Sequence, residues 1–68
     1  MNELIFLIED ALEGGYTARA LGESIFTQGE SLEILYKNIR EAILCHFDES
    51  QVPKIVRIHY VRDEVLEL

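Results

Sequence analysis

Leu4-Ile5-Phe6-Leu7-Ile8 is an unbroken run of five large apolar residues near the start of a 68-residue chain. A short run of this kind is typical of a β-strand that is buried on both faces. Such a strand lies inside a sheet rather than at its edge, so the rest of the chain has to supply neighbours on both sides. The sequence therefore predicts a fold that is built around residues 4–8.

Two further strands are predicted directly after this run. Gly14-Gly15 is a turn signal, because glycine adopts positive φ angles at little cost. A strand over residues 16–21 follows, and a short Gly-Glu turn then leads into a third strand over residues 24–28. Consecutive strands joined by short turns pair antiparallel, so these three strands are expected to form a meander.

A helix is predicted after the meander. Gly29 breaks the third strand, and Ser31 is a good N-cap because its hydroxyl can accept a hydrogen bond from a free amide of the first turn. From residue 32 to about residue 47, side chains recur at helical spacing and form one stripe. The stripe consists of Leu32, Leu35, Ile39, Ala42, Ile43 and His46.

The last strand is predicted over residues 54–62, after Pro53, which prevents the helix from continuing. The element order is then β-β-β-α-β, an α+β fold with strand order 3-2-1-4 and the helix packed on one face. The helix returns the chain so that the last strand can run parallel to the first, which becomes central. No repeat or linker divides the chain, so residues 1–68 are expected to form a single domain. The pattern leaves the conformation of residues 63–68 open.

The net charge of the chain bears on which partners it can bind. Thirteen acidic residues against six basic ones give a net charge of −7. Nucleic-acid binding relies on Lys and Arg to neutralise phosphates, so direct binding of nucleic acid is not expected. An acidic surface favours a basic protein partner, and the alternative is that the charge only keeps a small protein soluble.

Sequence features also bear on location and cofactors. The N-terminus lacks the basic start of a signal peptide, and no apolar stretch approaches the roughly 20 residues of a membrane span. A lone cysteine fits a reducing compartment, so we expect a cytoplasmic protein that does not enter a membrane. Cys45, His46 and His59 show no zinc-ligand spacing, and no cofactor is predicted. We interpret Cys45 as a small core or interface residue.

Three segments of the chain resemble, in order and spacing, the pattern of the N-terminal domain of HicB-type antitoxins. They are Gly14-Gly15-Tyr16-Thr17-Ala18-Arg19, Thr27-Gln28-Gly29-Glu30-Ser31-Leu32-Glu33 and Asn38-Ile39-Arg40-Glu41-Ala42-Ile43. The resemblance covers roughly residues 4–47. It implies a truncated RNase H-like sheet with one helix, and a protein that neutralises HicA, a small basic RNA-cleaving toxin, by binding over its active site.

Two features depart from the HicB pattern. Full-length HicB proteins usually carry a C-terminal DNA-binding domain, and we expect none in this chain, so the resemblance does not extend to autoregulation of an operon. The loop Leu21-Gly22-Glu23-Ser24 is shorter than usual and lacks the typical proline, so a contact made there by other members does not transfer.

An RNase H-like fold also raises the alternative of a metal-dependent nuclease. Such sites hold two divalent cations with clustered carboxylates, and Asp10, Glu41 and Asp63 are the candidates here. We expect no enzyme, because solvated acids are the norm in so acidic a chain. Cys45 and His46 are adjacent on the predicted helix, so their side chains diverge by about 100° and make a poor catalytic pair.

The apolar residues of the first strand, the last strand and the tail predict that the chain is not a monomer. A sheet with one face in water alternates apolar and polar residues, and the first strand does not alternate. Large exposed apolar patches mark interfaces, so we expect a symmetric homodimer or a tetramer of dimers. The candidate interface residues are Ile55, Val61, Val65, Leu66 and Leu68. The alternative to a homo-oligomer is that the tail folds back over the sheet and covers it within one chain. The alternative to the antitoxin function is a family member that has no toxin and whose only partner is itself.

Overall fold

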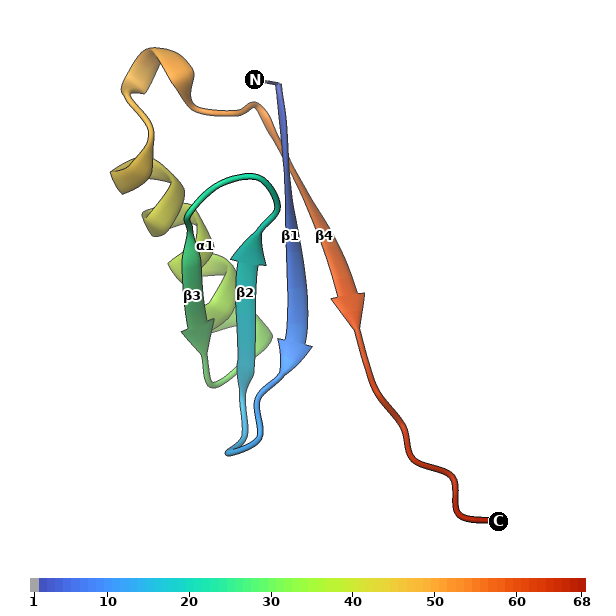
Figure 1. Ribbon diagram of the computed structural model, residues 1–68. Helices are drawn as coiled ribbons and strands as arrows, with labels where there is room; N and C mark the ends of the chain where they lie inside the picture. The colour runs from blue at the N-terminus through green and yellow to red at the C-terminus, as the bar shows by residue number, and fades with distance from the viewer. Residues whose placement is uncertain (1) are drawn as a thin grey trace.

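The computed structural model describes residues 2–68, which form one sheet, one α-helix and a short 3-10 helix (Figure 1). The elements are β1 (Glu3–Asp10), β2 (Tyr16–Ala20), β3 (Phe26–Gly29), α1 (Leu32–His46), η1 (Glu49–Gln51) and β4 (Ile55–Val61). The four strands lie in the order β3-β2-β1-β4. This arrangement confirms the predicted α+β class, the β-β-β-α-β order and the central position of the first strand.

β1 organises the sheet. It pairs antiparallel with β2, with Ile8 opposite Ala18, and parallel with β4, with Phe6 beside Ile58. β2 in turn pairs antiparallel with β3. The ladder with β2 continues to the pair of Asp10 and Tyr16, so β1 extends two residues beyond the apolar run from which it was predicted.

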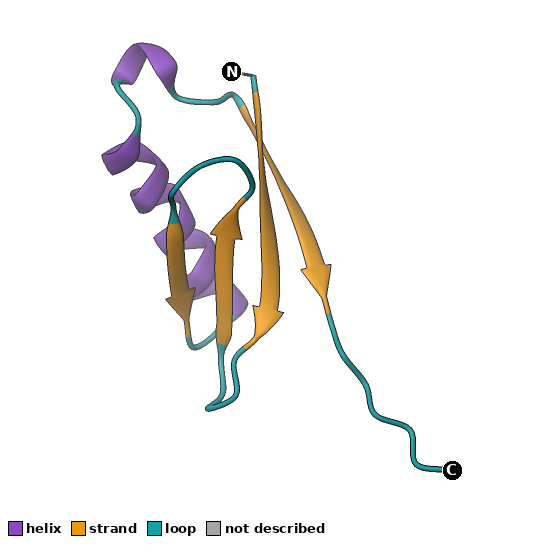
Figure 2. Cartoon of the chain, in the orientation of Figure 1, coloured by secondary structure: helices purple, strands orange, loops and turns teal. Residues whose placement is uncertain are grey.

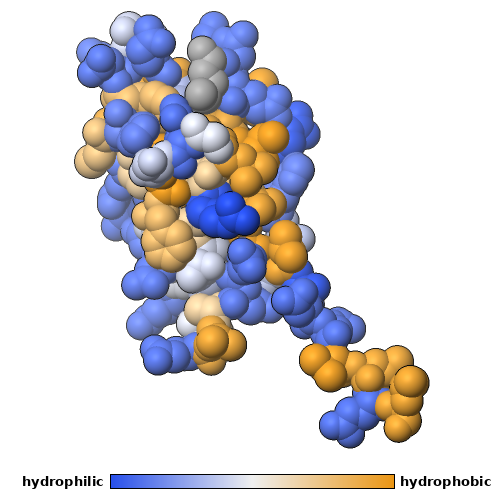
Figure 3. Space-filling view, in the orientation of Figure 1, coloured by the Kyte–Doolittle hydropathy of each residue, from blue (hydrophilic) through white to orange (hydrophobic). Residues whose placement is uncertain are grey.

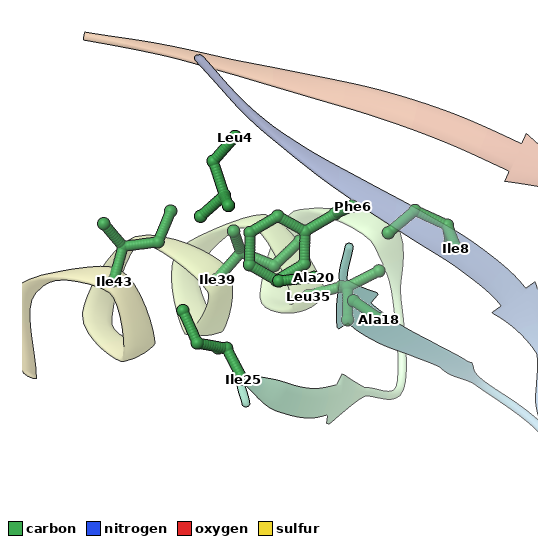
Figure 4. Close-up of a cluster of buried hydrophobic side chains, with 9 residues drawn as sticks. All are labelled: Leu4, Phe6, Ile8, Ala18, Ala20, Ile25, Leu35, Ile39 and Ile43. Atoms are coloured by element: carbon green, nitrogen blue, oxygen red, sulfur yellow. The ribbon is translucent and has the colours of Figure 1, made fainter. Parts of the chain in front are cut away.

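The hydrophobic core lies between α1 and one face of the sheet (Figure 4). Phe6 is completely buried at its centre, because β1 directs its even-numbered side chains toward the helix. The buried cluster consists of Leu4, Phe6, Ile8, Ala18, Ala20, Ile25, Leu35, Ile39 and Ile43. The helix therefore contributes to the core with the middle of the predicted stripe.

The end of α1 differs from the prediction. The sequence pattern places His46 in the apolar stripe, but its side chain is exposed. Cys45, predicted to lie in the core or an interface, is also exposed and is therefore not a core residue. The helix ends at His46, and Phe47 is extended, with φ −101° and ψ 146°. Helical spacing no longer predicts side-chain directions beyond this point, and Phe47 packs against the core where the stripe predicted His46.

α1 does not cover the whole sheet (Figure 2). Its backbone lies nearest to β2 and β3, and its side chains reach those of β1, whereas all seven residues of β4 are exposed. Gly29 explains part of this placement, because a Cβ atom there would lie 2.7 Å from the backbone nitrogen of Leu35. The start of the helix is thus held close to the end of β3, away from β4. Neither helix in residues 2–68 has the length and apolar character of a membrane-spanning segment.

Candidate interaction surfaces

Residues 14–19, 27–33 and 38–43, the three segments quoted from the sequence, meet at one end of the molecule. A Cβ atom on Gly15 would lie 2.7 Å from the carbonyl oxygen of Gly29, so the β1–β2 turn touches the end of β3. The side-chain amide of Asn38 donates a hydrogen bond of 2.7 Å to the carbonyl oxygen of Gln28. This bond ties α1 to β3, so all three segments join in one junction.

The junction explains why these residue types occur where they do. Gly14 and Gly15 have φ angles of +100° and +80°, which favour glycine. The Ser31 hydroxyl accepts a hydrogen bond of 3.2 Å from the backbone amide of Ile34 and caps α1. The pattern therefore reflects the backbone geometry of the fold, and any binding function has to come from the side chains around it.

An open depression adjoins this junction, between the β1–β2 turn, the end of β3 and the first turns of α1. Three carboxylates belong to its lining, those of Asp10, Glu13 and Glu30, and all three residues are exposed. Among the described residues that line it there is no Lys or Arg. Leu12 projects from the turn and is fully exposed. We call this region the acidic depression.

A small polar cluster lies at the rim of the acidic depression. The hydroxyl of Tyr60 donates a hydrogen bond of 2.5 Å to Oδ1 of Asp10, and this bond raises the pKa of Tyr60 above its ordinary value. The guanidinium of Arg62 lies 3.7 Å from Oδ2 of Asp10 and 5.6 Å from the centre of the Tyr60 ring. Tyr16 meets Tyr60 edge-on, with ring centres 6.0 Å apart. Asp10 thus has partners within the chain.

Glu13 and Glu30 differ from Asp10 in this respect. Within residues 2–68, the ion pairs join Arg57 to Glu3 and Arg62 to Asp10. Neither pair involves Glu13 or Glu30, so both carboxylates present their charge to solvent. The acidic depression therefore keeps a negative field that a basic partner can meet.

β4 forms a second exposed surface. It pairs with β1 on one side, and among the described residues no strand pairs with its other edge. Ile55 and Val61, which were predicted as candidate interface residues, are 54% and 40% exposed. Val56 and Ile58 face the helix side but are still 36% exposed, because α1 does not reach over them.

A groove separates β4 from α1. Its lining consists of Tyr36, Ile39, Arg40, Val56 and Ile58, and it is mainly apolar. Its volume is about 300 Å³. The sequence pattern does not predict this groove, because Val56 and Ile58 have the spacing of residues that a helix would cover. We call it the α1–β4 groove.

The tail, residues 62–68, leads away from the body of the molecule (Figure 1). Val65, Leu66 and Leu68 are 92%, 84% and 117% exposed. Apolar atoms gather on the end of the tail, separated from the body, in the space-filling view (Figure 3). The alternative in which the tail folds back over the sheet is therefore not the arrangement in this structure.

Comparisons with known proteins identify relatives of nearly the same length. The chain is 54% identical over 55 residues to a UPF0150 protein of Archaeoglobus fulgidus, an alignment that covers 81% of this chain and 82% of that protein. It is 41% identical over 62 residues to a UPF0150 protein of Thermotoga maritima, covering 91% and 87% of the two chains. The chain belongs to the UPF0150 family. No family model and no solved structure matches it.

The UPF0150 chain does not bring the nuclease candidates together. Asp10 ends β1, Glu41 is exposed on α1, and Asp63 lies on the tail. Within residues 2–68, no three His, Cys, Asp or Glu side chains are arranged to hold a metal ion.

Proposed function

We propose that this UPF0150 protein is a protein-binding module of the cytoplasm that inhibits a small basic RNA-cleaving partner of the HicA type. The acidic depression is the observation that supports this role best. It presents the carboxylates of Glu13 and Glu30 beside the three segments that resemble HicB antitoxins. The resemblance indicates the class of partner, and the charge of the depression gives a physical reason for binding it.

The depression suits a partner that is rich in Lys and Arg. Long-range attraction between opposite charges raises the association rate and makes it depend on ionic strength. The fully exposed Leu12 beside Glu13 adds an apolar contact that becomes buried on docking. A charged rim around one apolar anchor is a common arrangement at protein interfaces.

Native-cell capture tests the proposal first. The protein is used as bait in its own cells, and we expect recovery of a small basic protein, encoded by an adjacent open reading frame. The recovered protein should cleave RNA alone and lose this activity when the UPF0150 chain is added. Recovery of the bait alone, or of a partner that has no effect on RNA, would contradict the inhibitor role.

A charge-neutralised variant locates the binding site. Glu13→Gln with Glu30→Gln keeps side-chain shape and removes two charges from the acidic depression. We expect an association rate at least about tenfold slower at low salt, and little difference from the parent at high salt. The matched control, Glu41→Gln with Glu49→Gln, removes the same charge from exposed sites outside the depression. An equal loss in both variants would mean that the overall charge, not the depression, attracts the partner.

A homo-oligomeric family member without a toxin is the second candidate. The exposed tail and the uncovered β4 favour self-association irrespective of any other partner. If capture returns only further copies of the chain, this second function replaces the first.

A further inference from the structure

We propose that a second copy of this chain docks on β4, so that residues 56–68 of the two copies pair antiparallel and each tail packs along the α1–β4 groove of the other. This inference goes beyond the inhibitor function and does not depend on a toxin. It rests on the free edge of β4, the groove beside it and the bare apolar residues of the tail.

β4 is the less protected of the two edges of the sheet. It has seven residues, whereas the other edge strand, β3, has four and leads directly into α1. Proteins protect edge strands with lysine, proline, bulges or short length. The sequence Ile55–Val61 contains neither lysine nor proline, and its one arginine, Arg57, is engaged by Glu3 of the neighbouring strand. The free edge is therefore open to another strand.

The direction of the side chains shows what the tail can bring to the groove. Val56, Ile58 and Tyr60 lie beside Leu4, Phe6 and Ile8 in the parallel ladder, so they face the same side as α1. Arg62 faces this side too, since its guanidinium lies near Asp10 and Tyr60. If the tail continues this alternation as a strand, Leu66 and Leu68 face the groove side as well.

One pairing register brings apolar residues together on the helix side of the ribbon and opposite charges together on the other side. A two-fold axis at Arg62 sets Ile58 opposite Leu66 of the second copy, and Val56 opposite its Leu68. The two leucines then pack beside Val56 and Ile58 and extend the apolar wall of the α1–β4 groove. On the other face the same register sets Arg57 opposite Glu67 of the second copy, a pair of opposite charges.

The pairing also accounts for the residues at its centre. The two Arg62 side chains meet at the axis, where each has Asp10 of its own chain at 3.7 Å to offset its charge. Antiparallel pairing about a two-fold axis is self-complementary, so one set of contacts forms twice and the assembly closes. Monomers rarely expose apolar patches larger than a few hundred Å², and this arrangement covers the tail and the groove together.

Sedimentation equilibrium at micromolar concentrations tests the proposal. We expect the intact chain to sediment as two copies, or an even number of copies, of its 7.9 kDa mass. Leu66→Asp with Leu68→Asp should raise the dissociation constant of the dimer at least about a hundredfold, which is about 2.8 kcal/mol, because both copies lose their groove contacts. These two side chains are 84% and 117% exposed, so the change leaves the fold of each chain intact, as circular dichroism can verify.

Leu12→Asp is the matched control. Leu12 is 107% exposed and lies in the β1–β2 turn, away from β4 and the tail, so its substitution should leave the dimer unchanged. A mass near 7.9 kDa at all concentrations overturns the proposal. A dimer that survives the double variant, or one that Leu12→Asp breaks equally well, also overturns it. Toxin binding is not part of this assay, so failure of the dimer proposal can be distinguished from failure of the inhibitor proposal.

Cross-linking tests the register. In a Cys45→Ser background, which removes the one native thiol, Ile58→Cys with Leu66→Cys should give disulfide-linked dimers under mild oxidation. Ile58→Cys alone should not, because the two copies of residue 58 lie far apart along the ribbon. Equal cross-linking of the single and double variants would rule out this register.

Discussion

Replacing Phe6 and Phe26 with leucine, one at a time, tests which face of the sheet stabilises the fold. Phe6 lies in β1 and is 0% exposed between the sheet and α1, whereas Phe26 lies in β3 and is 64% exposed. Phe26 is beside Arg19, which is beside Leu7, so it belongs to the face that α1 does not cover. The two substitutions are chemically identical and differ only in their surroundings.

The expected magnitudes follow from burial. Truncating a buried phenylalanine to alanine costs about 3–5 kcal/mol, and leucine keeps part of the packing, so we expect about 1–2 kcal/mol for Phe6→Leu. Phe26→Leu should change the free energy of unfolding by less than about 0.5 kcal/mol, as is usual for surface positions. A domain of this size has a total stability of roughly 3–10 kcal/mol, so the first change is large and the second small.

Urea unfolding followed by circular dichroism measures both effects. With a slope of about 1 kcal/mol per molar urea, typical of a small domain, Phe6→Leu should lower the midpoint by about 1–2 M. Protein concentration has to be held constant, since association of copies shifts apparent stability. An equal or larger loss for Phe26→Leu would refute this assignment of the core and would mean that the open face is buried in solution.

Two further predictions concern the junction and the rim of the acidic depression. Gly29→Ala should destabilise the fold by about 1–3 kcal/mol in the same urea assay, because its Cβ would lie 2.7 Å from the backbone nitrogen of Leu35. Gly14→Ala, with nothing within 4 Å, should cost only the strain of its positive φ, about 1–2 kcal/mol, and α1 should not shift in nuclear magnetic resonance spectra. The hydrogen bond to Asp10 raises the pKa of Tyr60, so its stabilising effect should be complete below about pH 10 and should be lost as the pH rises through the folded-state pKa. Tyr60→Phe should therefore lose less stability than the parent as the pH rises above about 10, which urea unfolding at a series of pH values can measure. If the parent and the variant have the same pH profile, the hydrogen bond does not form in solution.

The sequence predicts most of the fold because its signals are local. The apolar run at residues 4–8, the glycines of the first turn and the cap at Ser31 each act through neighbouring residues. These signals identify the strands and the helix and, through chain connectivity, the strand order. The prediction is wrong at His46, the last residue of α1, because Phe47 leaves the helix and packs against the core in its place.

The candidate surfaces depend on contacts between distant residues. The hydrogen bond between Tyr60 and Asp10 joins positions 50 residues apart, and the acidic depression combines residues of the β1–β2 turn, the end of β3 and the first turns of α1. No periodic pattern encodes these approaches. The charge of the chain predicts a basic partner, but only the fold shows where Glu13 and Glu30 present that charge.

The sequence by itself determines the order of the elements, the central strand and the set of apolar residues that need burial, because propensity and periodicity act within each segment. Only the tertiary structure decides how much of the sheet the helix covers. The close approach of Gly29 to Leu35 places the backbone of α1 near β2 and β3. This contact depends on the space left by the missing side chain of Gly29, and no repeating sequence pattern signals it. As a result both faces of β4 remain exposed, and Val56 and Ile58 line a groove although their spacing is that of core residues.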